Sequence, residues 1–207
     1  MPNLLKQSLM TTLSFARANS FRGCVVLSGS QAWCQKAAMQ CLSLSLARAL
    51  ASKQADVKRR TVYWVGASVP ASDSIRAIAP HAAAQLLGGD TDCLVIDAWS
   101  GLAPDMLGMT SGTLRGGALL LLLTPPFEQW PTYDDPDYQR YQALRPSPYA
   151  MSGYFLQRVV RLFEQAKMAS KTPWLSIVEQ SACVDGYGYD YVDSDADLTI
   201  PAMQKAD

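Results

Sequence analysis

Hydrophobic and polar positions alternate between two patterns along the chain, and the first is a short, continuous apolar run. Runs of this kind are too short for a buried helix and are typical of strands covered on both faces of a sheet. They predict five strands, within residues 23–29, 61–67, 92–99, 116–125 and 172–180.

The second pattern is helical spacing, which appears between these runs. Leu5, Leu9, Leu13 and Ala16 recur on one face behind Asn3, a suitable N-cap. Further helices are predicted for residues 31–54, 72–89, a short segment from Pro104, and 151–169. In the third of these segments, Ser72 or Asp73 is the expected cap and Gly88-Gly89 the expected stop.

Strands that alternate with helices predict an α/β fold with right-handed crossovers. We therefore expect three layers: a mostly parallel, five-stranded sheet with helices on both faces, of a degenerate P-loop-like or Rossmann-like kind. The pattern leaves the order of the strands open.

The size of the chain, 207 residues with 49% hydrophobic and 17% charged residues, suits one globular domain. We place that domain at residues 1–180. Two segments break the rhythm of strands and helices. Residues 125–149, with six of the twelve prolines, predict an irregular excursion held by aromatic rings, and the acidic residues 181–207 predict a linker.

Charge and cysteine content narrow the class of protein further. The net charge is zero, so any contact with RNA would need a local basic patch. The five cysteines include no Cys-x-x-Cys pair, which favours small buried side chains in a reducing compartment. No segment resembles a signal peptide or a membrane span, so we expect a cytoplasmic protein without a membrane partner.

The turn after the first strand, Ser28-Gly29-Ser30, stands where a nucleotide-binding protein has its phosphate loop. Such a loop needs glycine-rich backbone, a lysine for the phosphates and a Ser or Thr for magnesium. Here there is a single glycine, and Lys36 lies well inside the next helix. Asp97 likewise ends a strand where a magnesium-binding aspartate would stand. We predict a degenerate site that binds no nucleotide, with no catalytic, cofactor-binding or metal-binding residue.

Three tryptophans, Trp33, Trp99 and Trp130, follow predicted strands and would share the rim where open α/β folds bind ligands. One interpretation is a platform that stacks RNA bases. The other is a structural plug that fills an obsolete pocket. The plug is favoured, because a stacking platform is usually interleaved with basic residues.

Basic residues gather at two places, Lys58, Arg59 and Arg60 before the second strand and Arg158 with Arg161 on the last long helix. Both groups are candidate contacts for RNA phosphates. The alternative is that they are simply the solvated face of a loop and a helix.

Three stretches, RGCVVLSGSQAWC, CLVIDAWSGLAPDMLGMTSGTLRGGALLLLLTP and FEQWP, together carry a family resemblance. The chain from about residue 20 to residue 180 resembles the N-terminal domain of the bacterial tRNA(Met) cytidine acetyltransferases. The resemblance implies a longer parent enzyme with a helicase-like ATPase domain, an acetyl-CoA-dependent acetyltransferase domain and a tRNA-binding part. Such an enzyme makes N4-acetylcytidine at the wobble position, consuming ATP.

The resemblance implies a noncatalytic N-terminal domain that braces the ATPase domain or helps to hold tRNA, and that leads through residues 181–207 to domains absent from this chain. No ATP or acetyl-CoA motif of the family has a counterpart here, so we expect acetyl-CoA, ATP and Mg²⁺ to bind elsewhere in the parent. Two alternatives stay open, an independent nucleotide-binding α/β protein and a pure protein-interaction module.

Overall fold

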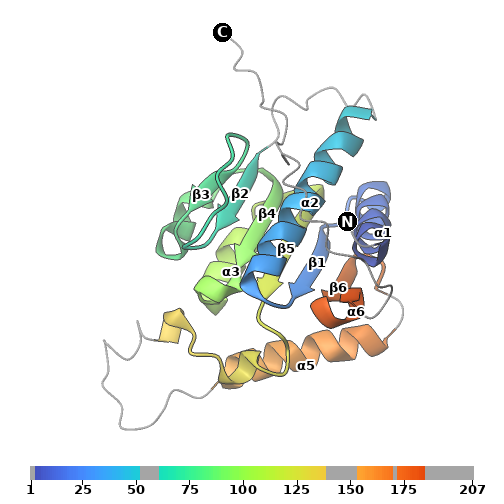
Figure 1. Cartoon of the computed structure of the whole chain (residues 1–207). Helices are drawn as coiled ribbons and strands as arrows, with labels where there is room; N and C mark the ends of the chain where they lie inside the picture. Colours follow the sequence, from blue (N-terminus) through green and yellow to red (C-terminus); the bar gives the residue numbers. More distant parts are fainter. Residues whose placement is uncertain (1–2, 52–60, 139–152, 170–171, 185–207) are drawn as a thin grey trace.

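The computed structural model describes residues 3–51, 61–138, 153–169 and 172–184 and contains a six-stranded, entirely parallel sheet (Figure 1). The strand order is β3-β2-β4-β5-β1-β6, so the first strand of the chain lies inside the sheet. The strands are β1 (Gly23–Ser28), β2 (Val62–Val65), β3 (Arg76–Ile78), β4 (Thr91–Asp97), β5 (Leu114–Thr124) and β6 (Leu175–Glu179). The α/β class and the five expected strands are confirmed, and β3 is an additional strand.

Two layers of helices cover the sheet, as the alternating pattern predicted. The helices α1 (Asn3–Asn19) and α2 (Gln31–Ala51) pack on one face, where Leu5, Leu9 and Leu13 join a first core. The other face is covered by α3 (Pro104–Ser111), α5 (Tyr154–Met168) and the 3₁₀ helices η2 (Pro80–Leu86) and η4 (Trp130–Thr132). In Figure 1, α2 crosses the near face of the sheet and α5 runs below it. The short elements η3 (Ala98–Ser100) and α6 (Gln180–Val184) follow β4 and β6.

The leucine run of β5 divides its side chains between the two cores. Leu119, Leu121 and Leu123 point into the first core, and Leu122 points into the second. Because successive side chains of a strand point to opposite faces, only a strand covered on both sides needs every position to be apolar. This is why the run is continuous and why β5 lies in the interior of the sheet, between β4 and β1.

Residues 72–89 do not form the predicted helix. Ala79, immediately before Pro80, has an extended backbone with ψ of 145°. Proline disfavours helical conformation in the residue before it and lacks an N–H to donate. The chain before Pro80 therefore pairs with β2 as β3, and η2 begins at Pro80 itself. The predicted stop is present in part, because Gly88 has a φ of +80° that favours glycine.

The apolar spacing of α5 identifies its buried face except at one position. Phe155, Val159 and Phe163 pack against the second core, and Leu156 and Val160 are buried. Leu162, which has the same spacing, is 50% exposed. The ring of Phe163 stacks on Phe127 with centroids 5.8 Å apart. The segment after β5 therefore packs against this face of α5, a contact that helical periodicity does not contain.

Candidate functional site

The turn between β1 and α2 has the position of a phosphate loop, but other parts of the chain occupy its amides. The backbone N–H of Gly29 donates to the Thr124 carbonyl at 3.0 Å. The backbone N–H of Ser30 donates to Oε1 of Gln180 at 2.8 Å. A side-chain amide from the end of β6 thus takes the N–H that a phosphate oxygen would otherwise bind.

Gly29 is required here by close packing. A Cβ at this position would lie 2.7 Å from Cβ of Gln180 and 2.9 Å from Cε3 of Trp33. Real Cβ atoms do not approach other atoms so closely, so any larger residue would displace Gln180 or Trp33. The single glycine of the loop is explained by its protein neighbours, without a bound phosphate.

Asp97 ends β4 beneath the first turns of α2 and is completely buried. Its Oδ1 accepts a hydrogen bond from the Trp99 backbone N–H at 3.1 Å. Gln31 and Gln35 approach from α2 but leave Oδ2 without a hydrogen-bond partner. Burial raises the pKa of Asp97, and the Trp99 hydrogen bond and the nearby amides of Gln35 and Gln31 oppose the shift. Magnesium binds through one or two carboxylates together with waters or phosphates, and Asp97 has no exposed surface at which those ligands could join it.

The three tryptophans predicted to share one rim lie on both sides of the sheet. Trp33 packs against the first core, and the fully buried Trp130 belongs to the second, stacked on Phe127 with centroids 6.3 Å apart. Trp99 meets Tyr133 edge-on at 5.4 Å, and the Tyr133 hydroxyl donates to the Trp99 carbonyl at 2.8 Å. The sheet therefore separates Trp33 from Trp130. Whether any of these rings stacks on bases stays a prediction.

Asp135 anchors the excursion after β5. Its place among prolines and other acidic residues, with Asp134 and Asp137, is typical of a solvated loop, and for Asp135 that interpretation is wrong. The Asp135 side chain is fully buried. Its Oδ2 accepts the Leu102 N–H at 3.1 Å, and its Oδ1 accepts the Asp137 N–H at 2.8 Å. Burial raises the pKa of Asp135, and these two hydrogen bonds oppose the rise. The carboxyl group ties residues 125–138 to the loop after β4; residues 139–149 of the excursion lie outside the described part.

The two predicted basic groups have different outcomes. Lys58, Arg59 and Arg60 lie outside the described residues. Arg158 and Arg161 are both exposed, and their spacing of three residues places them on one side of α5. In the described ranges, no helix combines the length and hydrophobicity needed to cross a bilayer. Nor do three or more His, Cys, Asp or Glu side chains of those ranges cluster as metal ligands.

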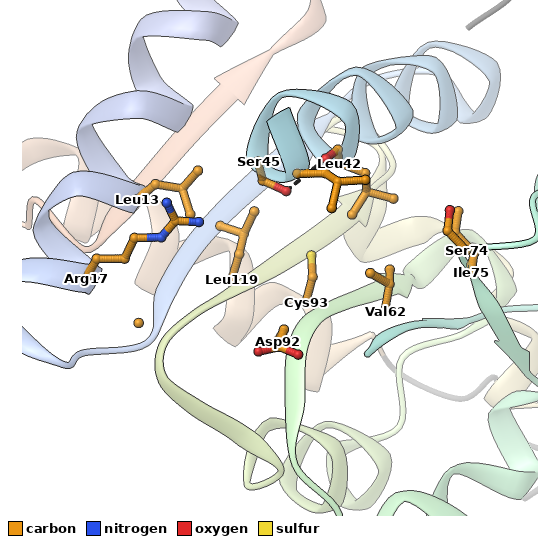
Figure 2. Close-up of a pocket in the computed structure, with 12 residues that line it drawn as sticks. Leu13, Arg17, Leu42, Ser45, Val62, Ser74, Ile75, Asp92, Cys93 and Leu119 are labelled. Carbon is orange, nitrogen blue, oxygen red and sulfur yellow. Dashed lines mark hydrogen bonds between the residues drawn. The ribbon is translucent and has the colours of Figure 1, made fainter. Parts of the chain in front are cut away.

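A cavity of about 40 Å³ lies at the amino ends of the strands, the end opposite to the turn after β1 (Figure 2). Leu13 of α1, Leu42 of α2, Val62 of β2, Cys93 of β4 and Leu119 of β5 form its apolar wall, as Figure 2 shows. A volume of about 10–15 Å³ holds one water molecule, whereas small-molecule sites measure roughly 300–1,000 Å³. The cavity is a packing defect of the first core and too small for a substrate.

Comparison of the sequence with known proteins identifies a family and several relatives. Residues 1–170 match the family model described as tRNA(Met) cytidine acetyltransferase TmcA, N-terminal. A TmcA of that name from Nitrosococcus halophilus is 32% identical over 164 residues, which are 79% of this chain and 20% of the relative. The Salmonella typhimurium relative is 30% identical over 154 residues, 74% of this chain and 20% of its own length. The Haloferax volcanii relative is 35% identical over 83 residues, 40% and 11% respectively. The chain thus spans no more than about one fifth of these relatives.

Proposed function

This chain belongs to the family of N-terminal domains of the tRNA(Met) cytidine acetyltransferase TmcA, and we propose its role from that membership. The chain is the noncatalytic N-terminal domain of an enzyme that modifies tRNA(Met). In the proposed reaction, that enzyme makes N4-acetylcytidine at the wobble position from acetyl-CoA and consumes ATP. Its ATPase and acetyltransferase domains lie in the four fifths of the relatives that this chain does not cover.

The closed turn after β1 carries the proposal. Gln180 takes the Ser30 amide, Thr124 takes the Gly29 amide, and the three residues 28–30 include no basic side chain. A polyphosphate at this turn would find the Gly29 and Ser30 amides already bonded and no basic side chain within residues 28–30. This supports a domain that kept the outline of a nucleotide-binding fold while nucleotide chemistry moved to another part of the enzyme. Bracing the ATPase domain is then its principal task.

Separating the two parts of the enzyme tests this role. The chain and the remainder of its enzyme are produced separately and assayed for acetylcytidine in tRNA(Met), with acetyl-CoA and Mg-ATP, by mass spectrometry of nucleosides. We expect no product from the chain alone, reduced product from the remainder, and recovery when the two are mixed. Acetylation by the chain alone, or no association between the two parts, would contradict the proposal.

Direct contact with tRNA is a second candidate role, favoured by the exposure of Arg158 and Arg161 on one side of α5. Charge reversal at both positions should weaken tRNA binding and flatten its salt dependence. With fewer phosphate contacts, fewer counterions are released from the tRNA on binding. Replacement of Lys58, Arg59 and Arg60 together tests the other basic group in the same way. Unchanged affinity in both variants, with binding to the rest of the enzyme retained, favours a pure protein-interaction module.

A further inference from the structure

The outer edge of β6 is open along the described part of the chain. β6 ends the strand order and pairs only with β1. The Cys24 N–H donates to the Trp174 carbonyl at 2.7 Å. Backbone groups of a strand alternate in direction, so those of Ser176 and Val178 also point to β1, and those of Leu175, Ile177 and Glu179 point outward.

One outward group already has a local partner, and the others are available. The Leu175 N–H donates to the Thr172 carbonyl at 2.9 Å. Among the described residues, the outward N–H and carbonyl of Ile177 make no backbone hydrogen bond. A strand edge of this kind is a template on which another extended segment can pair.

A groove of about 400 Å³ follows this edge. Thr11 of α1 lines one side and Ala166 with Lys167 of α5 lines the other. In Figure 1, β6 lies between α1 and α5 at the end of the sheet.

The floor of the groove shows that it runs along the edge of the strand. Ser176 faces α1, since its hydroxyl is 2.7 Å from Oγ1 of Thr12, whereas Leu175 and Ile177 pack against the core on the other face. Residues from both faces of β6 line the one groove. Only a groove along the outer edge of the strand can contact both faces.

The two edges of the sheet differ in protection. β3 has three residues and begins with the exposed Arg76, and short strands and charges are the usual means of blocking an edge. β6 has five residues, and its one charge, Glu179, is paired with Lys167 at 3.0 Å. Trp174, just before β6, is 39% exposed. The β6 edge is the one suited to pairing.

We propose that the β6 groove binds one extended segment from the remainder of the same enzyme, which adds to the sheet as a seventh strand beside β6. This inference rests on the proposed function. The groove's occupant is sought in the remainder of the enzyme because the chain spans only 20% of the length of a relative that is 32% identical to it. Main-chain hydrogen bonds to Ile177 supply affinity, as in other cases of strand addition. Alternation gives the segment apolar side chains beside Leu175 and Ile177 and small polar ones beside Thr11 and Ser176.

Amide hydrogen exchange distinguishes strand addition from side-chain docking. We expect exchange of the Ile177 N–H to slow by at least about tenfold when the separately produced remainder of the enzyme is added to the isotope-labelled chain. The Ala77 N–H is the matched control, since the Gly66 N–H donates to the Ile78 carbonyl and Ala77 therefore points outward from the opposite edge. Its exchange should not change.

A variant tests the groove itself. Thr11 is exposed, so Thr11→Arg extends a long side chain into the groove without disturbing the core. It should weaken association by about tenfold or more. Ala18→Arg adds the same charge at an exposed position on α1, roughly 10 Å further along the helix, and should leave affinity within twofold. Both variants should keep the thermal unfolding midpoint of the parent chain.

The outcomes separate this inference from the proposed function. Equal binding by the Thr11→Arg variant, or an unprotected Ile177 amide in the complex, overturns the groove proposal and leaves the bracing role intact. No association of the unaltered chain overturns both. Dimers of the chain alone with Ile177 protected assign the groove to a second copy and overturn the named occupant.

Discussion

The side chain of Gln180 accepts a hydrogen bond from the backbone N–H of Ser30 at 2.8 Å, across 150 residues of sequence. This contact joins the turn after β1 to the point where the chain leaves β6. The carboxyl ends of the two neighbouring strands are thereby fixed to each other, and the turn is closed from within the domain.

Gly29 and Gln180 should be energetically coupled. Gly29→Ala brings a Cβ within 2.7 Å of Cβ of Gln180, and overpacking of this kind costs about 1–3 kcal/mol in the free energy of unfolding. In a Gln180→Gly background the obstructing Cβ is gone, so the same substitution should cost less, though Trp33 still restricts it. Urea unfolding of the four proteins measures the coupling. Strictly additive effects would contradict the packing account.

Mg-ATP should not bind the chain. The Gly29 and Ser30 amides are occupied, and residues 28–30 carry no positive charge. Titration calorimetry should detect no binding tighter than about 1 mM, an affinity equivalent to only about 4 kcal/mol. The Gln180→Gly variant is the informative control, because it frees one amide without supplying a cation and should also fail to bind. A nucleotide bound beside Gly29 would restore the independent nucleotide-binding alternative.

Asp97→Asn should remove a pH-dependent cost of folding. Burial raises the pKa of Asp97 in the folded chain above its unfolded value of about 3.9. The folded state therefore holds the proton more tightly, and this group's contribution to stability falls as pH rises from about 4 through the folded pKa. Asparagine keeps an oxygen for the Trp99 N–H and has no charge to bury. The stability of the variant relative to the parent should rise across that window and then level.

Asp135→Asn is the matched comparison for the other fully buried aspartate. Both oxygens of Asp135 accept backbone N–H groups, from Leu102 and Asp137, so an asparagine would turn an NH₂ group toward one of these donors. An unsatisfied buried donor costs about 1–3 kcal/mol, so this variant should be destabilised near neutral pH. Urea unfolding of both variants from pH 4 to 8 gives the test. A loss of stability in Asp97→Asn equal to that in Asp135→Asn would refute the distinction.

Buried thiols should be inert in the native chain. Burial raises the pKa values of Cys34 and Cys41 to about 12. At pH 8 the reactive thiolate is then roughly one part in 10,000 of each group. Iodoacetamide should leave both cysteines unmodified over hours in buffer and label both in concentrated urea, as measured by mass spectrometry of peptides. Rapid native labelling of Cys34 would show that α2 opens readily over Asp97.

The sequence predicted best those elements whose own hydrophobic pattern indicates what must pack against them. The apolar runs of β1, β4 and β5 required cover on both faces, and the spacing of Leu5, Leu9 and Leu13 required a helix on a sheet. The helix predicted for residues 72–89 is wrong, because Pro80 restricts the backbone of Ala79 more strongly than the apolar spacing favours a helix. This restriction is visible in the sequence, since it depends only on Pro80 following Ala79.

The turn after β1 shows a different limit. The missing lysine and glycines are visible in the sequence and predict a loop without phosphate chemistry. What closes the loop is not visible, because Gln180 reaches Ser30 only when β6 lies beside β1, and the sequence pattern does not determine the order of the strands. Asp135 is a similar case, because its carboxylate oxygen accepts the Leu102 N–H only when residues 125–138 lie against the loop after β4. Non-local contacts of this kind have no local pattern.

Filling the cavity of Figure 2 should stabilise the chain. Val62→Ile, on its wall, adds one methylene group to a space of about 40 Å³ and should raise the free energy of unfolding by up to about 0.8 kcal/mol. Val95→Ile is the matched control, since Val95 on the neighbouring strand β4 is fully buried in the same core and does not line the cavity. Overpacking there should cost about 1–3 kcal/mol. Urea unfolding with an unchanged m-value measures both, and effects of the same sign would show that the cavity is not available to an added methylene.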